Sequence, residues 1–248
     1  MDDITTGREF LKSSRWMEWR KTPTDQKKKV AFPPLEKPYP ADAKLIDLVA
    51  PKDFAAGKIT LSDAISRRVS HRKFTDALLS LEELSFLLWA TQGVKEIIRD
   101  GYATRRNVPS GGARHSFETY LCVQRVQGLT PGLYRYLALE HKLILLNDDP
   151  EMYRKVNDAT EDQNFGSAVV FIWTTIPYRT EWRYSIVSHK LILLDAGHVC
   201  QNLYLACEAI GCGTCAIGAY NQEKMDAVLG VDGQDELTVY CAPVGKLQ

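Results

Sequence analysis

Four fixed cations stand beside a hydroxyl and a histidine in residues 67–74, which read RRVSHRKF. The whole chain carries 31 basic and 31 acidic residues, so this local excess of positive charge needs its own explanation. A guanidinium offers a planar fork of donors that suits phosphate, and a serine hydroxyl adds a donor without adding charge. The segment indicates an anion-binding site, and a solvated basic helix end is the alternative that these eight residues alone leave open.

Two glycine-rich segments and a lysine supply further chemistry. The PSGG of residues 109–112 precedes a predicted strand, and its glycines let the backbone come close to a ligand. Residues 211–218, GCGTCAIG, are small throughout, and Lys246 stands where the last predicted strand enters a turn. A basic cluster, two such loops and this lysine are the groups that grip a phosphorylated planar cofactor.

The segment 211–218 also contains two motifs that suggest other chemistry. Its glycines and Ala216 match the GxGxxG/A dinucleotide fingerprint, but that motif needs a preceding strand and here a helix is predicted before it. Cys212 and Cys215 form a CxxC, yet no second pair has zinc-ligand spacing, and a redox CxxC also needs a preceding strand. We predict small packing residues beside a ligand and no metal site. His198 is likewise predicted to be a hydrogen-bonded interior histidine.

Regular elements must hold these residues in place. Thr60 and Ser80 are each followed three residues later by an acidic residue, a capping box that predicts a helix start, and the second helix is expected to end at Gly93. Apolar and β-branched runs predict strands at 117–123, 133–136, 167–175 and 237–242. A long, largely buried helix is predicted at 191–210. Strands grouped with helices that pack on them indicate an α+β sheet domain.

Composition limits the class of protein. The 248 residues are 45% hydrophobic and 25% charged with zero net charge, which argues against a nucleic-acid coat or a membrane-surface protein. No stretch approaches the roughly 20 apolar residues of a membrane helix, and the start lacks the apolar core of a signal peptide. We therefore expect a cytoplasmic protein with a small ligand and with its six cysteines as reduced core thiols.

The N-terminal part differs in composition from the rest of the chain. Residues 32–40 read FPPLEKPYP, and each proline fixes φ and disfavours helix just before it. We predict an N-terminal extended arm over residues 1–57 that lies on another surface, followed by one domain over residues 58–248. A proline-rich recognition motif is the alternative.

Several of these segments, taken in order, resemble a known family. RxSxRxF (Arg68, Ser70, Arg72, Phe74), PSGG, an AIG-type loop and a terminal VGK are similar to the flavin-binding signature of the nitroreductase superfamily. PSGGARHSFETYL, GLTPGLYRYLALEHKLILL and LDAGHVCQNLYLACEAIGCGTCAIGAY resemble its SagB-type dehydrogenase branch, which includes azoline oxidases of peptide biosynthesis. The resemblance covers most of residues 60–246. It implies a nitroreductase-like three-layer α+β fold, with a central mainly antiparallel sheet flanked by helices, in a homodimer with one FMN in each of two interface sites.

The resemblance also implies which residues bind FMN. Cations near the phosphate neutralise it, and a positive group near the pyrimidine edge favours reduction of the flavin. Val69 is also counted among the FMN-binding positions, although many members carry a second arginine there, and a valine weakens the positive field. The implied FMN-binding residues are Arg68, Ser70, Arg72 and Lys246 at the phosphate and the ribityl or pyrimidine end, Pro109, Ser110 and Gly111 from the other subunit, and the backbone N–H of Ala216, Ile217 or Gly218 at flavin N5.

The implied activity is an FMN-dependent oxidoreductase that takes hydride from NADH or NADPH by a ping-pong mechanism and reduces a small conjugated acceptor, such as a nitroaromatic or a quinone. In the azoline-oxidase branch a Lys-Tyr pair precedes the long helix, and here the matching residues are Arg183 and Tyr184. Arginine stays protonated and cannot act as a base at neutral pH. The pair is therefore assigned to the acceptor pocket, with packing at the subunit interface as the alternative. Two alternative functions stay open. One is an azoline-type peptide-tailoring flavin oxidase acting with partner proteins, and the other is a flavin-binding module without turnover.

Overall fold

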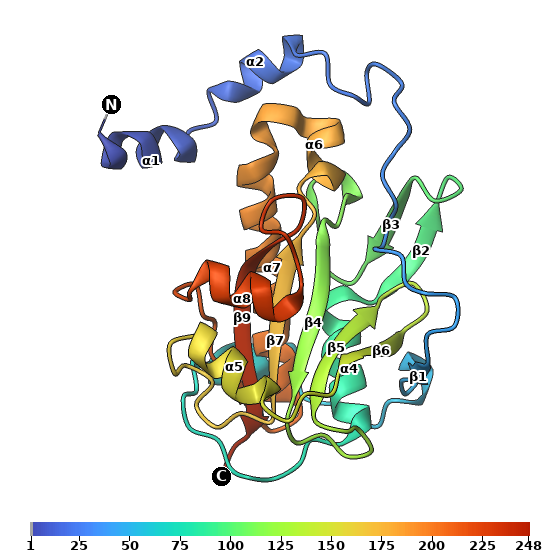
Figure 1. The fold of residues 1–248 in the computed structure, drawn as a ribbon, viewed down its shortest axis with the longest axis vertical. Coiled ribbons are helices and arrows are strands. Elements are labelled where there is room, and N and C mark those ends of the chain that lie inside the picture. Colours follow the sequence, from blue (N-terminus) through green and yellow to red (C-terminus); the bar gives the residue numbers. More distant parts are fainter. Residues whose placement is uncertain (1) are drawn as a thin grey trace.

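A seven-stranded sheet forms the centre of the computed structural model, which describes residues 2–248 (Figure 1). All neighbouring strands in this sheet are antiparallel. A separate hairpin pairs β2 (Val94–Ile98) with β3 (Ala103–Arg106). From one edge to the other the large sheet runs β1 (Leu45–Asp47), β6 (Lys142–Asn147), β5 (Gly132–Leu137), β4 (Phe117–Val123), β7 (Val169–Thr175), β9 (Leu237–Lys246) and β8 (Cys212–Thr214).

The central strands are buried on both faces. Phe117 and Leu121 of β4 belong to one core cluster, whereas Tyr120 and Cys122 belong to the cluster on the other side. Because successive side chains of a strand point to opposite faces, a strand covered on both sides reads as a continuous apolar run. β7 has the same character over VVFIWTT. The strands predicted at 117–123 and within 167–175 are confirmed.

Helices cover both faces of this sheet (Figure 1). α4 (Leu81–Gln92) and α7 (Ser188–Ala209) pack together on one face, and α5 (Met152–Ala159) and α8 (Gln222–Leu229) cover the other. This arrangement is the predicted α+β fold with helical layers around an antiparallel sheet. After residue 57 the chain also forms the helices α3 (Leu61–Arg67) and α6 (Tyr178–Tyr184) and the short 3-10 turns η2 (Gly111–Ala113) and η3 (Ser185–Val187), and a further 3-10 turn, η1 (Pro51–Asp53), precedes them.

The predicted helix caps are confirmed. Thr60 accepts a hydrogen bond from the Asp63 N–H at the start of α3. Ser80 and Glu83 form a reciprocal capping box at the start of α4, which ends at Gly93 as expected. Each cap satisfies backbone donors that a helix start otherwise leaves unpaired.

One face of α7 differs from the prediction of a largely buried helix. Leu193 and Leu194 are each 52% exposed, and Gly197 and His198 of the next turn are also exposed. These positions recur at helical spacing and form one stripe, which we call the open face of α7. No element among residues 2–248 covers this stripe. His198, predicted to be interior, lies on it.

The N-terminal segment is helical at its start, in contrast to the extended arm predicted over residues 1–57. α1 (Asp3–Leu11) begins at Asp2, whose side chain accepts from the Thr5 N–H, and α2 (Arg15–Lys21) follows. Both helices precede Pro23, the first proline of the chain, so the restriction that disfavours helix does not reach them. Residues 22–44 contain turns but neither helix nor strand, as an arm would.

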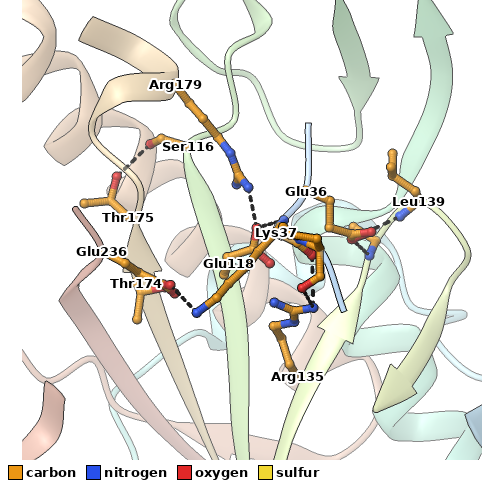
Figure 2. Close-up of polar contacts among 12 residues, drawn as sticks. Glu36, Lys37, Ser116, Glu118, Arg135, Leu139, Thr174, Thr175, Arg179 and Glu236 are labelled. Carbon is orange, nitrogen blue, oxygen red and sulfur yellow. Dashed lines mark hydrogen bonds and ion pairs between the residues drawn. The ribbon is translucent and has the colours of Figure 1, made fainter. Parts of the chain in front are cut away.

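The arm is held on the sheet of its own chain by a buried polar cluster (Figure 2). Lys37 donates its backbone N–H to Glu118 of β4 over 2.8 Å and pairs its ammonium with Glu236 over 2.6 Å. Glu118 also forms a buried ion pair with Arg179 over 2.7 Å. Arg135 of β5 donates to the Lys37 carbonyl. Buried charges are tolerated only when paired in this way, so the arm and the sheet complete one another.

The described chain has two further features that bear on its class. No helix in residues 2–248 is both long and apolar enough to cross a membrane. The six cysteines are free thiols and all of them are buried, as predicted for core thiols.

Candidate flavin site

Tyr204 of α7 joins two segments that the sequence analysis assigned to one site. The guanidinium carbon of Arg68 lies 5.3 Å from the centroid of the Tyr204 ring. The Tyr204 Oη lies 2.9 Å from Ser70 Oγ and accepts a 2.8 Å hydrogen bond from the Ala216 N–H. Since Ala216 supplies a proton to Tyr204, the Tyr204 hydroxyl can donate to Ser70 and leave the serine proton free for an anion. The basic segment and the AIG loop therefore meet at one side chain.

The cations of the basic segment have no carboxylate partners. Within residues 2–248, none of Arg67, Arg68, Arg72 and Lys73 makes an ion pair. Arg72 is exposed and Arg68, at the end of α3, is half-buried. Val69, which lies between them in sequence, is 50% exposed. This segment is a concentrated positive charge in a neutral chain, as an anion site requires.

Close packing against β8 and β9 fixes the course of the basic segment. The His71 N–H donates to the Thr214 carbonyl over 2.9 Å. A Cβ on Gly213 would lie 2.7 Å from His71 Cβ, and a Cβ on Gly245 would lie 2.6 Å from Phe74 Cγ. Both distances are too short for any larger residue. The glycine within CGTC is therefore needed for packing on the basic segment.

The AIG loop has one free backbone donor. The Ala216 N–H donates to Tyr204, and the Ile217 N–H donates to the Cys241 carbonyl over 2.8 Å. Gly218 is exposed, and its N–H has no hydrogen-bond partner among residues 2–248. Of the three N–H groups predicted to face a cofactor, only that of Gly218 is available for one.

Lys246 lies at the end of β9 but points toward α4. Its ammonium pairs with the carboxylate of Glu83, and both side chains are mostly buried. Burial alone lowers the pKa of Lys246, but the hydrogen bond to Glu83 and the nearby Cys212 outweigh it, so the net shift is upward. Lys246 stays charged, and a phosphate would have to compete with Glu83 for it.

The PSGG loop is anchored to α7 at Asp195, closer to the start of the helix than Tyr204. Ser110 donates its hydroxyl to Asp195 over 2.7 Å, and the Gly111 N–H donates to the same carboxylate over 3.1 Å. Burial raises the pKa of Asp195, although these donors oppose the shift. Pro109 is exposed beside them. The loop therefore presents its outer backbone while Asp195 holds its inner side.

Arg183 and Tyr184 lie against this loop at the end of α6. Gly112 has a φ of +63°, and a Cβ there would lie 2.5 Å from Tyr184 Oη and 3.1 Å from Arg183 Nη1. The Arg183 guanidinium also lies 5.3 Å from the Tyr184 ring centroid. The structure thus brings Arg183 and Tyr184 to the PSGG loop, although not to the basic segment.

Two half-sites result, and they do not meet within one chain. Asp195 marks the PSGG half and Tyr204 marks the half that holds the basic segment and the AIG loop. They are about 14 Å apart along α7, because each helical residue adds about 1.5 Å. The open face of α7 runs between the two levels. A complete site of all predicted residues needs a second surface beside α7.

The alternative motifs of residues 211–218 have structural explanations. The segment follows α7 and forms β8, so no strand precedes the GxGxxG-like pattern and the Rossmann interpretation fails on geometry. Burial raises the pKa of the Cys212 thiol to about 12, which leaves it protonated and unreactive at neutral pH. No group of three or more potential ligand side chains is placed to hold a metal within residues 2–248.

Sequence reasoning missed the two α7 side chains that organise the half-sites. Both had a signal in the sequence. Asp195 is a carboxylate inside the apolar run LILLDAGHVC, and a buried carboxylate needs donors. Tyr204 is a tyrosine in a mostly apolar helix, and a buried tyrosine hydroxyl usually finds a partner.

Two known proteins are similar to this chain in sequence. A candidate nitroreductase of Methanocaldococcus jannaschii is 29% identical over 190 residues, which are 76% of this chain and 92% of that protein. The trifolitoxin-processing protein TfxB of Rhizobium leguminosarum bv. trifolii is 28% identical over 166 residues, 62% of this chain, and this chain spans less than half of it, 44%. Similarity to a peptide-toxin processing protein agrees with the resemblance to the SagB-type branch.

Solved structures agree in fold. A crystal structure described as a nitroreductase candidate from Ralstonia eutropha JMP134 superposes with a TM-score of 0.66 at 23% identity, covering 88% of this chain and 99% of that one. A chain of the Escherichia coli microcin synthetase McbBCD complex, with truncated pro-MccB17 bound, superposes with a TM-score of 0.60 at 18% identity, covering 97% and 94%. The model of the nitroreductase family matches residues 65–246, which span the basic segment, both half-sites and Lys246. The chain belongs to the nitroreductase family.

Proposed function

We propose that this nitroreductase-family oxidoreductase binds FMN, accepts hydride from NADH or NADPH and reduces a small conjugated acceptor. The observation that carries the proposal is the set of unpaired cations in residues 67–73, joined through Tyr204 to the AIG loop. Members of the family typically bind FMN. Bound FMN supplies the two-electron carrier between donor and acceptor.

The residues present fit the phosphate of FMN. Arg68 and Arg72 have no competing carboxylate within the described chain, and Ser70 keeps a proton to donate. A doubly charged phosphate needs this combination of fixed cations and adjustable donors. Lys246 adds a third cation if the phosphate replaces Glu83 as its partner.

The flavin ring needs a donor at N5, and Gly218 is suited to this role. Its N–H is unpaired and exposed, and nothing lies within 4 Å of where its Cβ would be. Backbone donors of this kind are rigid, so they orient the ring without reorganising. Arg183 cannot serve as a base, and its place beside the PSGG loop suits the orientation of an acceptor.

A homodimer would complete the site, and the open face of α7 fits a second copy. Gly197 lies at the middle of this face with nothing within 4 Å of its missing Cβ, which permits close approach of another helix. An antiparallel crossing at Gly197 would bring the start of the partner's α7, with its Leu191, toward the level of Tyr204. Because Leu191 touches Gly111, the crossing brings the partner's PSGG loop to the basic segment. Exposed Leu193 and Leu194 would be covered.

The absorption spectrum of the purified protein and anaerobic mixing with NADH or NADPH test this function. We expect bound FMN and bleaching of the flavin by at least one nicotinamide. Arg72→Gln should weaken FMN binding at least tenfold and leave riboflavin, which has no phosphate, unchanged. Lys73→Gln is the matched control with FMN affinity intact. A protein that stays colourless with added FMN would contradict the proposal.

The second candidate is an azoline-type peptide-tailoring oxidase that acts with partner proteins. It is favoured by the similarity to the trifolitoxin-processing protein and by Tyr184, which lies beside the PSGG loop. Arg183 in place of a lysine disfavours it. A flavin that neither NADH nor NADPH reduces would support this candidate over the first.

A further inference from the structure

The N-terminal helix α2 packs on the 3-10 turn η3 that directly follows α6, next to the side chains assigned to the acceptor pocket. The rings of Trp16 and Trp19 lie 5.9 and 5.8 Å from the ring of Tyr184, measured between centroids. The Trp19 indole N–H donates to the Arg183 carbonyl over 3.2 Å. Two aromatic contacts and one hydrogen bond therefore fix the orientation of the Arg183–Tyr184 pair.

These contacts continue from Tyr184 to the PSGG loop. Tyr184 Oη and Arg183 Nη1 fill the space where Gly112 lacks a side chain. The Arg183 guanidinium stacks on the Tyr184 ring from the same end of α6. A displacement of Tyr184 would thus free both Arg183 and the loop beside it. Trp16 and Trp19 act on the PSGG half-site through Tyr184.

The next residues of the arm hold α2 in this place. The Lys27 ammonium donates to the carbonyls of Arg20 and Thr22 over 3.0 and 2.8 Å, at the C-terminal end of the helix. It also lies 5.2 Å from the Trp19 ring centroid. The Gln26 N–H donates to the Trp182 carbonyl over 2.9 Å. α2 is therefore anchored at its C-terminal end to α6.

A groove of about 600 Å³ lies between this helix and the start of α7. Trp16 forms part of one wall, and Val187, Leu191 and Leu194 form the apolar opposite wall. Leu191 also contacts Gly111 of the PSGG loop. Charged side chains of α1 and α2, among them Glu9 and Arg15, also line this groove, and its volume is large enough for a small organic molecule.

We infer that Trp16 and Trp19 of α2 are positioning residues, which hold Arg183 and Tyr184 against the PSGG loop and thereby restrict the size of the acceptor that this half-site admits. The inference rests on the proposed function, because it concerns which acceptors reach that flavin. The family model begins at residue 65, so α2 lies outside the part of the chain that matches it.

The test separates acceptor size from electron supply. The flavin is reduced anaerobically with dithionite, and its reoxidation is followed by stopped flow with 1,4-benzoquinone and with the three-ring 9,10-phenanthrenequinone. In Trp16→Ala/Trp19→Ala we expect the ratio of the three-ring to the one-ring rate constant to rise about tenfold over the wild type, since loss of two aromatic contacts loosens the wall. Trp19→Phe, which loses only the indole donor, should give a smaller rise. Met17→Ala, which is 62% exposed on the same helix, should leave the ratio unchanged.

A ratio that stays at the wild-type value in the double variant, with FMN bound, would overturn the inference. Dithionite replaces the nicotinamide, so failure of NADH or NADPH to reduce the flavin would contradict the proposed function without affecting this result. Hydrogen exchange of the apoprotein gives a second measurement that needs no flavin. The backbone amides of residues 109–115 and 180–187 should exchange about tenfold faster in the double variant than in the wild type. In Trp19→Phe the same amides should show a smaller increase. Unchanged exchange in both variants would equally overturn it.

Discussion

The hydroxyl of Tyr204 joins the basic segment to the AIG loop. Tyr204→Phe keeps the ring beside Arg68 but removes the partner of Ser70 and of the Ala216 N–H. The loss of such a hydrogen bond costs about 1 kcal/mol. We expect the Tm of the apoprotein to fall by a few degrees and the Kd for FMN to rise about fivefold. Thermal denaturation and quenching of FMN fluorescence measure the two effects.

Tyr153→Phe is the matched control, because Tyr153 lies on α5 at the opposite face of the sheet with its hydroxyl 3.4 Å from Ser167. It should leave the Kd for FMN unchanged. An equal rise in both variants would mean that Tyr204 acts only through general stability.

Glu36 makes stability depend on pH. Burial, with the nearby charges of Glu118 and Glu140, raises the pKa of Glu36 from 4.5 to about 7, while its carboxylate accepts from the Ala138 N–H. The folded state therefore holds this proton more tightly than the unfolded state. The stabilisation that comes from the bound proton of Glu36 is fully present below about pH 4.5 and is lost as the pH rises through 7. The free energy of unfolding should therefore fall between these two pH values.

Glu36→Gln should flatten this dependence, since the amide oxygen can still accept from Ala138 and has no charge to bury. Urea denaturation at a series of pH values measures the slope. Equal slopes in the variant and the wild type would contradict the assignment to Glu36.

At the scale of elements, α7 carries both half-sites and the proposed dimer contact. Gly197→Leu adds a side chain where two helices are proposed to cross, and nothing in its own chain lies within 4 Å of that point. We expect the mass in solution to fall from dimer to monomer and bound FMN to be lost. The Tm of the monomer should not fall, because leucine favours helix over glycine by up to about 1 kcal/mol.

Light scattering and the flavin absorption of the same sample measure these outcomes. Ala227→Leu, also exposed but on α8 across the sheet, is the control that should stay dimeric. A dimeric Gly197→Leu variant with full FMN would exclude the crossing at this residue.

The elements that sequence predicted well are those with local causes. The hydroxyl caps at Thr60 and Ser80 act within one helical turn, and β4 and β7 are buried on both faces and therefore mostly apolar. α2 has no buried residue, and its place depends on Tyr184, more than 160 residues away. The Tyr204 contacts depend in the same way on the approach of distant segments. Local patterns cannot encode such contacts, which is why the sequence offered candidate site residues but not the side chains, Asp195 and Tyr204, that connect their segments.

For the whole molecule, the pair between Lys37 and Glu236 ties the arm to the last strand of the sheet. Lys37→Met leaves Glu236, which also accepts from Tyr120 and Thr174, buried without its cation. Removal of one partner of a buried pair costs about 3 kcal/mol of stability. Because Lys37 is partly exposed, the loss of stability in this variant should be about that size or smaller. We expect a fall in Tm of about ten degrees or less by calorimetry.

The double variant Lys37→Met/Glu236→Gln should recover part of this loss, because no uncompensated charge is left. Lys28→Met, which breaks an exposed pair with Asp25, should change the Tm little. If the double variant were no more stable than Lys37→Met, the pair would not be the source of the stability.

The position of β9 has a consequence for biosynthesis. β9 is the last strand in sequence, yet it lies inside the sheet between β7 and β8. Glu236, the partner of Lys37, immediately precedes it. During translation, β7 must wait for β9 with one edge unpaired, and an unpaired apolar edge is the part of a nascent sheet most prone to aggregate. Folding of the sheet is thus tied to release of residues 237–246 from the ribosome, and until then the N-terminal arm has no completed surface on which to dock.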